Sequence, residues 1–248
     1  MCKKKKKFDR TKKNGIIAKV ETKEITKETT QSGRKIMKQM KKKILTVVLA
    51  MAMVLATTAC GSSANFERGT VEGNVYTNAS VGIKATVPEG LAVADEATVK
   101  EFEDAALASL ETQDLTEEQK ADLANAMIYD AVITSEAGTS IQIAAEDMKQ
   151  TMGVKVKADA YLDSLKETTK TSYEQMGCTV EFSDVDTVAL GGQDFSHMLI
   201  TIDLSGFAIE QEAYCRVVGN YMYYMIVTNM GDCEEAVTAF FDSMEAAN

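Results

Sequence analysis

The stretch FSHMLITIDLSGFAIEQEAYCRVVGNYMYYMIVT, residues 195–228, decides the fold of this 248-residue chain. It contains three runs rich in aromatic and large apolar residues, at 195–204, 207–218 and 221–228. Gly219-Asn220 separates the last two runs, and such a two-residue turn suits the positive φ angles of a tight hairpin. Because tight turns join antiparallel neighbours, the stretch predicts consecutive hairpins of one antiparallel sheet.

Shorter patterns of the same kind surround this stretch. We expect further strands, bounded by turn residues, at 75–77, 81–87, 128–134, 140–145, 179–185 and 188–190. Helices are expected from Asp95 to about Leu110, from the capping box Thr116-Glu117-Glu118-Gln119 through Met127, over 158–176, and after the cap Asp232-Cys233-Glu234-Glu235. Together these elements predict one α+β domain, in which helices pack on an antiparallel β-sheet.

The order of elements resembles the PsbP-like superfamily, which includes DcrB-like bacterial proteins. The residues that carry the resemblance are Tyr76, Gly82, Pro88-Glu89-Gly90, Leu190-Gly191-Gly192, the tyrosine-rich strand of Tyr221, Tyr223 and Tyr224, and a terminal helix. Leu91 stands where the family usually has tryptophan. The resemblance implies a layered sandwich and an accessory or scaffold role, and it brings no catalytic motif.

A basic and then apolar segment lies N-terminal to this domain. Lys41-Lys42-Lys43 precede the run 44–59, which is shorter than the roughly 20 apolar residues of a spanning helix and has the layout of a secretory signal. Thr57-Thr58-Ala59-Cys60 resembles the lipobox of bacterial lipoproteins, with Thr57 in place of the usual leucine. This resemblance implies a diacylglyceryl group on Cys60, and two acyl chains anchor a protein stably. The alternative is an ordinary signal peptide in which Cys60 is incidental.

The leader divides the chain into four parts. Residues 1–39 are expected to be a non-native or disordered extension, 40–59 the signal peptide, 60–74 a flexible tether and 75–248 the domain. The first 59 residues hold 17 of the 27 Lys+Arg and 4 of the 37 Asp+Glu, which leaves 10 basic and 33 acidic residues, a net charge of −23, on residues 60–248. This charge opposes binding to nucleic acid, and it either favours cationic partners or serves solubility alone.

Residues that could carry chemistry are few. His197 is the only histidine, and we favour a strand-packed imidazole over a catalytic one because no partner lies at a recognised spacing. Asp184 and Asp186 share a strand face that suits a cation, but two carboxylates are too few for a calcium site. Cys178, Cys215 and Cys233 follow no metal-binding spacing, and their disulfide state stays open. We therefore expect no catalytic residue, no metal and no cofactor.

The tyrosines of the last strand are the candidate interaction surface. Tyr221 and Tyr223 share one strand face, whereas Tyr224 lies on the other, across from Cys215. Aromatic residues on a strand pack in a core or form an exposed partner surface, and both interpretations stay open.

The sequence predicts a non-enzymatic accessory module, anchored by Cys60 to the extracytoplasmic face of the cell membrane, with a protein or envelope partner and no nucleic acid. The alternative is a ligand-binding lipoprotein of a transport system, although a two-lobed receptor needs a hinge between domains. An enzyme is the third class, which the absence of a nucleophile paired with a base disfavours.

Overall fold

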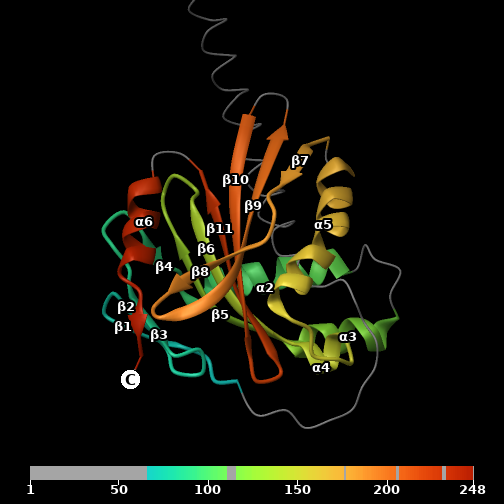
Figure 1. Ribbon diagram of the computed structural model, residues 1–248, viewed down its shortest axis with the longest axis horizontal. Helices are drawn as coiled ribbons and strands as arrows, with labels where there is room; N and C mark the ends of the chain where they lie inside the picture. The colour runs from blue at the N-terminus through green and yellow to red at the C-terminus, as the bar shows by residue number, and fades with distance from the viewer. Residues whose placement is uncertain (1–65, 111–115, 176, 205–206, 231–232, 248) are drawn as a thin grey trace, which may run out of the picture. The chain divides into compact units, whose positions relative to one another are not determined.

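The computed structural model of this protein describes residues 66–110, 116–175, 177–204, 207–230 and 233–247. Two antiparallel sheets and the helices packed on them make up this part of the chain (Figure 1). The predicted α+β class is thereby confirmed. The predicted extension, the signal peptide, Cys60 and the beginning of the predicted tether lie outside the described residues.

The larger sheet is built around the 195–228 stretch. Its strands, in spatial order, are β4 (Ala92–Val93), β5 (Met127–Thr134), β6 (Ser140–Asp147), β11 (Tyr221–Asn229), β10 (Phe207–Val218), β9 (Gln193–Leu204) and β7 (Thr179–Phe182), and β8 (Asp186–Leu190) also pairs with β9. Each of these pairings is antiparallel. The expected hairpins β5–β6, β9–β10 and β10–β11 are present, and Cys215 lies opposite Tyr224, as predicted.

The smaller sheet has the strand order β1 (Thr70–Glu72), β2 (Val75–Asn78), β3 (Ile83–Thr86) and β12 (Glu245–Ala246). Residues 66–74, expected to belong to a flexible tether, are instead part of the folded domain. β1 pairs with β2, and the Phe66 ring is buried, with its centroid 5.4 Å from that of Tyr221. A single aromatic residue in a polar segment has no periodicity, so the sequence did not reveal this boundary.

The described part of the chain contains five helices, α2 (Glu96–Leu110), α3 (Glu117–Ala126), α4 (Met148–Thr151), α5 (Ala158–Gln175) and α6 (Glu234–Asp242). Four of them were predicted, and α4, a single turn capped by Asp147, was not. The Asp95 carboxylate accepts a bond of 2.8 Å from the Thr98 N–H at the start of α2, and Thr116 and Gln119 form the expected capping box of α3. At α6, Cys233 precedes the helix and makes no side-chain capping bond, and Asp232 of the predicted cap lies outside the described residues.

The larger sheet is covered on both faces. On one face, alternate residues of β6 and β11 join a core with the smaller sheet and α6, and this core includes Ile141, Ile143, Tyr223, Met225 and Phe240. On the other face, α5 packs across β7, β9 and β10, and α4 contacts β6 and β11. Figure 1 shows α6 beside the smaller sheet and α5 at the far side of the larger one. Every residue of β6 is therefore buried, as is nearly every residue of β11.

Candidate functional site

The two tyrosines predicted as an interaction surface lie in the core. Tyr223 has no exposed surface, and Tyr221 is 8% exposed. Phe66 covers them both, and the Tyr223 hydroxyl lies 3.2 Å from that of Tyr76. Neither tyrosine is therefore available as an exposed surface. A strand that is apolar along its whole length has no alternation to show which face is covered.

A partly buried carboxylate, that of Asp130, joins the N-terminal segment and the smaller sheet to the larger sheet. Asp130 accepts hydrogen bonds from the Gly69 N–H at 2.5 Å, the Tyr76 hydroxyl at 2.5 Å and the Asn78 amide at 2.6 Å. Asp130 lies where the β5–β6 register shifts, and such a bulge redirects a side chain. Burial raises the pKa of Asp130, while the bonds from these donors oppose the rise. The network has a structural role, because it holds two separate segments against β5.

Another carboxylate, fully buried, lies on the α5 side of the sheet. Glu146 is 2% exposed, and its Oε2 accepts a bond of 2.5 Å from the Tyr161 hydroxyl of α5. Burial raises the pKa of Glu146 to about 7, with a smaller contribution from neighbouring Asp147. Glu146 is thus a proton-binding group inside the domain, which no pattern in the sequence indicated.

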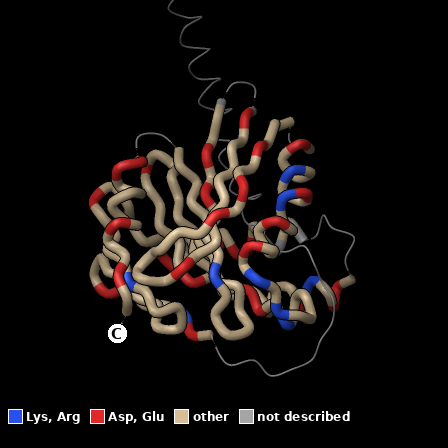
Figure 2. Tube along the Cα trace, viewed as in Figure 1, with Lys and Arg blue, Asp and Glu red and all other residues tan. Residues whose placement is uncertain are grey.

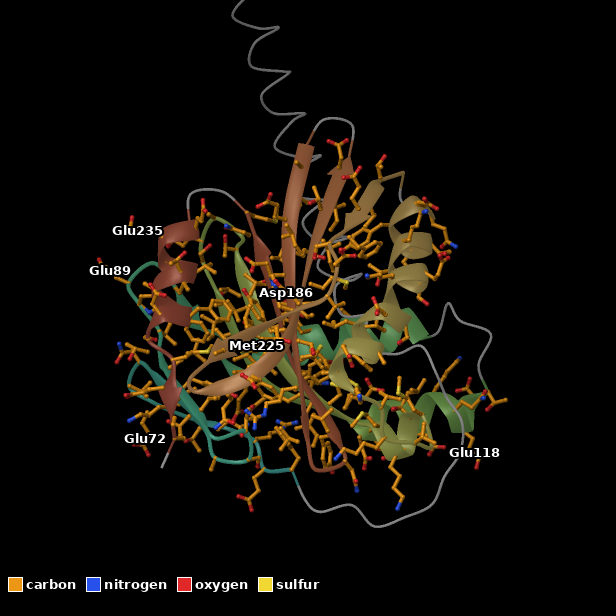
Figure 3. All side chains as sticks on the ribbon, viewed as in Figure 1. Glu72, Glu89, Glu118, Asp186, Met225 and Glu235 are labelled. Atoms are coloured by element: carbon orange, nitrogen blue, oxygen red, sulfur yellow. The ribbon has the colours of Figure 1, made fainter. Side chains whose placement is uncertain are left out.

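His197 lies at the centre of a more accessible cluster, formed with Asp186, Glu212 and Tyr214. His197 Nδ1 is 2.9 Å from Asp186 Oδ1 of β8, and Nε2 is 3.2 Å from Glu212 Oε2 of β10. The Tyr214 ring lies 4.7 Å from the imidazole, and its hydroxyl donates to Glu212. The His197 side chain is 18% exposed and that of Asp186 is 66% exposed. Figure 3 shows Asp186 at the beginning of β8.

The charges in this cluster determine its chemistry. The hydrogen bond to Glu212 raises the pKa of His197, with a further contribution from Asp186, and the bond from His197 lowers the pKa of Glu212. Below the raised pKa of His197, both imidazole nitrogens carry a proton and donate to the two carboxylates. Such an imidazolium has no free lone pair to accept a proton or bind a metal. The cluster is an ion-paired link between β8 and β10.

The remaining candidate residues, the aspartates and the cysteines, do not come together in one site among the described residues. Asp186 turns to His197, and among the described residues no group of three or more His, Cys, Asp and Glu side chains is placed to hold a metal ion. Cys178, Cys215 and Cys233 are free thiols. Cys215 is buried, and desolvation raises its pKa, which keeps the thiol protonated and unreactive.

Glu212 and Tyr214 were missed at the sequence level, although the turns carry a usable signal. The pairing of Leu204 with Phe207 sets the register that places His197 opposite Tyr214, and a two-residue turn at 191–192 places Asp186 opposite His197. The register of two hairpins therefore brings Asp186 and Tyr214 to the histidine. The lateral bond to Glu212 follows only from side-chain conformation.

No helix of the described residues combines the length and the apolar character that are required to cross a membrane.

Comparison with known proteins returns distant similarities of structure alone. No protein-family model and no curated protein matches the sequence. Cyanobacterial PsbP (CyanoP) from Synechocystis sp. PCC 6803 is similar at a TM-score of 0.40 and 12% identity, over 76% of this chain and 97% of that one. A protein from Bacteroides thetaiotaomicron VPI-5482 has a TM-score of 0.35 and 12% identity, over 72% of this chain and 50% of the other.

LpqN, involved in cell envelope biogenesis of Mycobacterium tuberculosis, has a TM-score of 0.35 and 9% identity, over 67% of this chain and 83% of that chain. PsbP belongs to the superfamily that the sequence resembles. Similarities at this distance carry no statement about activity or partner, and the α+β class rests on the strand pairing described above.

Proposed function

We propose that this chain is a non-enzymatic accessory module, held by a lipid on Cys60 at the extracytoplasmic face of a membrane, where it binds a protein or envelope partner. The observation that carries the proposal is the order of segments at 41–60, a basic run, an apolar run, small residues and then Cys60. Two acyl chains on that thiol would anchor the protein without a spanning helix.

The fold adds a geometric consequence to this proposal. Phe66 is already buried in the domain, so only residues 61–65 connect it to the lipid-bearing cysteine. A fully extended chain spans about 3.5 Å per residue, so the domain stands within about 20 Å of the membrane surface. A partner would then be a membrane protein or an envelope component close to the membrane.

The arrangement of reactive groups also supports a role without catalysis. Both nitrogens of His197 are engaged by carboxylates, and the Cys215 thiol is buried and protonated. A nucleophile and a base in hydrogen-bond contact are required for covalent catalysis.

Metabolic labelling with an alkyne-bearing fatty acid in a bacterial host tests the anchor. We expect the wild-type chain to carry label and to fractionate with membranes. Cys60→Ser should lose both properties, and Cys233→Ser, at a free and partly exposed cysteine of the domain, is the matched control and should keep both. Labelled Cys60→Ser, or Cys60→Ser that stays in the membrane fraction, would contradict the anchor.

Cross-linking and capture from solubilised membranes, with the lipidated chain as bait, tests the partner. We expect capture of the same envelope component from independent preparations. If a metabolite raised the melting temperature instead, the ligand-binding alternative would be favoured, because a ligand that binds only the folded state stabilises it.

A further inference from the structure

The β8 strand forms an open edge of the larger sheet. In the part of the chain that the structure describes, β8 pairs with β9 and with no other strand. Asp186, Thr187 and Ala189 of this strand are exposed. Edge strands usually carry lysine, proline or a bulge that prevents another strand from adding to them. The β8 sequence, DTVAL, has neither lysine nor proline, and its register with β9 is continuous.

The register of the β8–β9 hairpin shows which backbone groups face outward. Gly191 and Gly192 both have positive φ, at 59° and 74°, so the hairpin closes with a two-residue turn. In such a turn the flanking pair, Leu190 and Gln193, exchanges hydrogen bonds, and the bonded pairs then alternate along the ladder. Thr187 and Ala189 fall on the non-bonded pairs. Their N–H and C=O groups therefore point away from β9, toward the open edge.

Acidic residues predominate around this edge, and the nearby Arg216 is engaged by Gln193 and the Phe195 ring at the hairpin. Between Lys170 and Arg216 the sequence has no Lys or Arg and eight Asp or Glu. This segment includes β7, β8 and β9, and Figure 2 shows no basic residue along them. Asp194 lies opposite Ala189 on the outer face, and Asp184 is exposed just before β8. A strand added at β8 lies two strand spacings, about 10 Å, from Asp194, within reach of an extended lysine side chain.

The His197 cluster fastens the beginning of β8 to the rest of the sheet. Asp186 is drawn to His197 Nδ1, and His197 is in turn fixed by Glu212 of β10. This link holds β8 against β9 from the inner face and leaves the outward backbone groups of Thr187 and Ala189 free of side-chain competition.

We propose that the β8 edge is the partner-docking surface, and that its occupant is an extended, Lys- or Arg-rich segment of another protein that adds as a strand beside Thr187 and Ala189. The inference rests on the proposed function, because it names the kind of partner. Backbone hydrogen bonds would supply affinity and the acidic surroundings would select a basic sequence.

A fluorescein-labelled peptide of alternating Lys and Val, titrated with the detergent-solubilised full-length chain, tests this surface by fluorescence anisotropy. Thr187→Pro removes an outward N–H without breaking a β8–β9 hydrogen bond, and proline is tolerated on edge strands. Thr187→Ala is the matched control, because it keeps the N–H and removes the same side chain. We expect Thr187→Pro to weaken binding about tenfold and Thr187→Ala to leave it within about twofold of wild type.

A second measurement needs no variant, and so tests strand addition even if Thr187→Pro fails to fold. The wild-type chain is titrated with the same peptide N-methylated at alternate residues, which removes the N–H groups that a strand would use. Equal affinity for the methylated and unmethylated peptides, or equal binding by the two Thr187 variants, would overturn strand addition. Binding to an alternating Glu and Val peptide as tight as to the Lys peptide would overturn the basic occupant. Absence of binding to the Lys peptide at chain concentrations up to about 1 mM would overturn it too. Lipidation at Cys60 and capture of a membrane partner do not depend on these results, so failure of this surface is distinguishable from failure of the proposed function.

Discussion

Glu146 and His197 are the two residues whose protonation the fold changes in a way that experiment can follow. Burial raises the pKa of Glu146 from 4.5 to about 7, so the folded state binds this proton more tightly than the unfolded state. Folding stability is then lost as the pH rises from 4.5 to about 7 and is level above that range.

We expect Glu146→Gln to remove this pH-dependent loss of folding stability. Between about pH 5 and pH 8, the free energy of unfolding of the wild type should fall by roughly 3 kcal/mol relative to that of Glu146→Gln. Urea unfolding at the two pH values measures the difference. Glu89→Gln, at an exposed glutamate, is the control and should follow the wild type. Parallel pH profiles for Glu146→Gln and wild type would contradict the prediction.

His197 should show a pH dependence of the same sign as Glu146, and its partner Glu212 the opposite sign. The pKa of His197 is raised above 6.5, so its contribution to stability is complete below that pH and is lost as the pH rises through the higher, folded value. Glu212 has a pKa lowered from 4.5, so its contribution is present above 4.5 and is lost as the pH falls through the lower value.

His197→Gln should therefore lower the free energy of unfolding most between the lowered pKa of Glu212 and the raised pKa of His197. We expect a loss of about 1 kcal/mol near pH 5.5, the size of a partly exposed ion pair, and a smaller loss near pH 9. Thermal unfolding across pH measures it, with Asp184→Asn as a control that touches no part of the cluster. A loss of the same size at both pH values would rule out the ion-paired imidazolium.

Among the elements, the strands of the β8–β9 hairpin were predictable from the sequence. The contact of its turn with Ile83 and Glu245 of the smaller sheet was not. Turn residues and alternation are local, and they located both strands within a few residues. The strands β1, β4 and β12 escaped prediction because two or three residues carry no period, and each is a strand only through its pairing with a distant segment. Thus β12 exists because β3 lies beside it.

The two turn glycines of the β8–β9 hairpin distinguish the local requirement of the turn from the contact with the smaller sheet. A Cβ on Gly191 would lie 3.1 Å from the Glu245 carbonyl oxygen and 3.2 Å from Ile83 Cγ2, whereas a Cβ on Gly192 meets nothing within 4 Å. Both residues have positive φ. We expect Gly192→Ala to cost about 1 kcal/mol from backbone conformation alone, and Gly191→Ala to cost about 1–2 kcal/mol more. Urea unfolding compares them, and equal losses would show that the hairpin tip does not press on β12.

At the scale of the whole molecule, the N-terminal boundary of the domain depends on Phe66. The ring is 8% exposed and lies against Tyr221 and Tyr223, which makes 66–74 part of the core and not of the tether. Phe66→Ala should lower the free energy of unfolding by about 3 kcal/mol. Val71→Ala, at an exposed valine of β1, is the matched control and should change it by less than about 0.5 kcal/mol. Equal effects would place residue 66 outside the core.

By itself the sequence determined the antiparallel hairpins, the starts of α2 and α3, and the acidity of residues 60–248. These features follow from turn chemistry, capping and composition, which act between near neighbours in the chain. Only the tertiary structure decided that both faces of β11 are covered, that Phe66 belongs to the core and that Asp130 receives three donors from an N-terminal segment. Each of these depends on contacts between residues more than 50 positions apart, and no local pattern records which distant surface a strand face will meet.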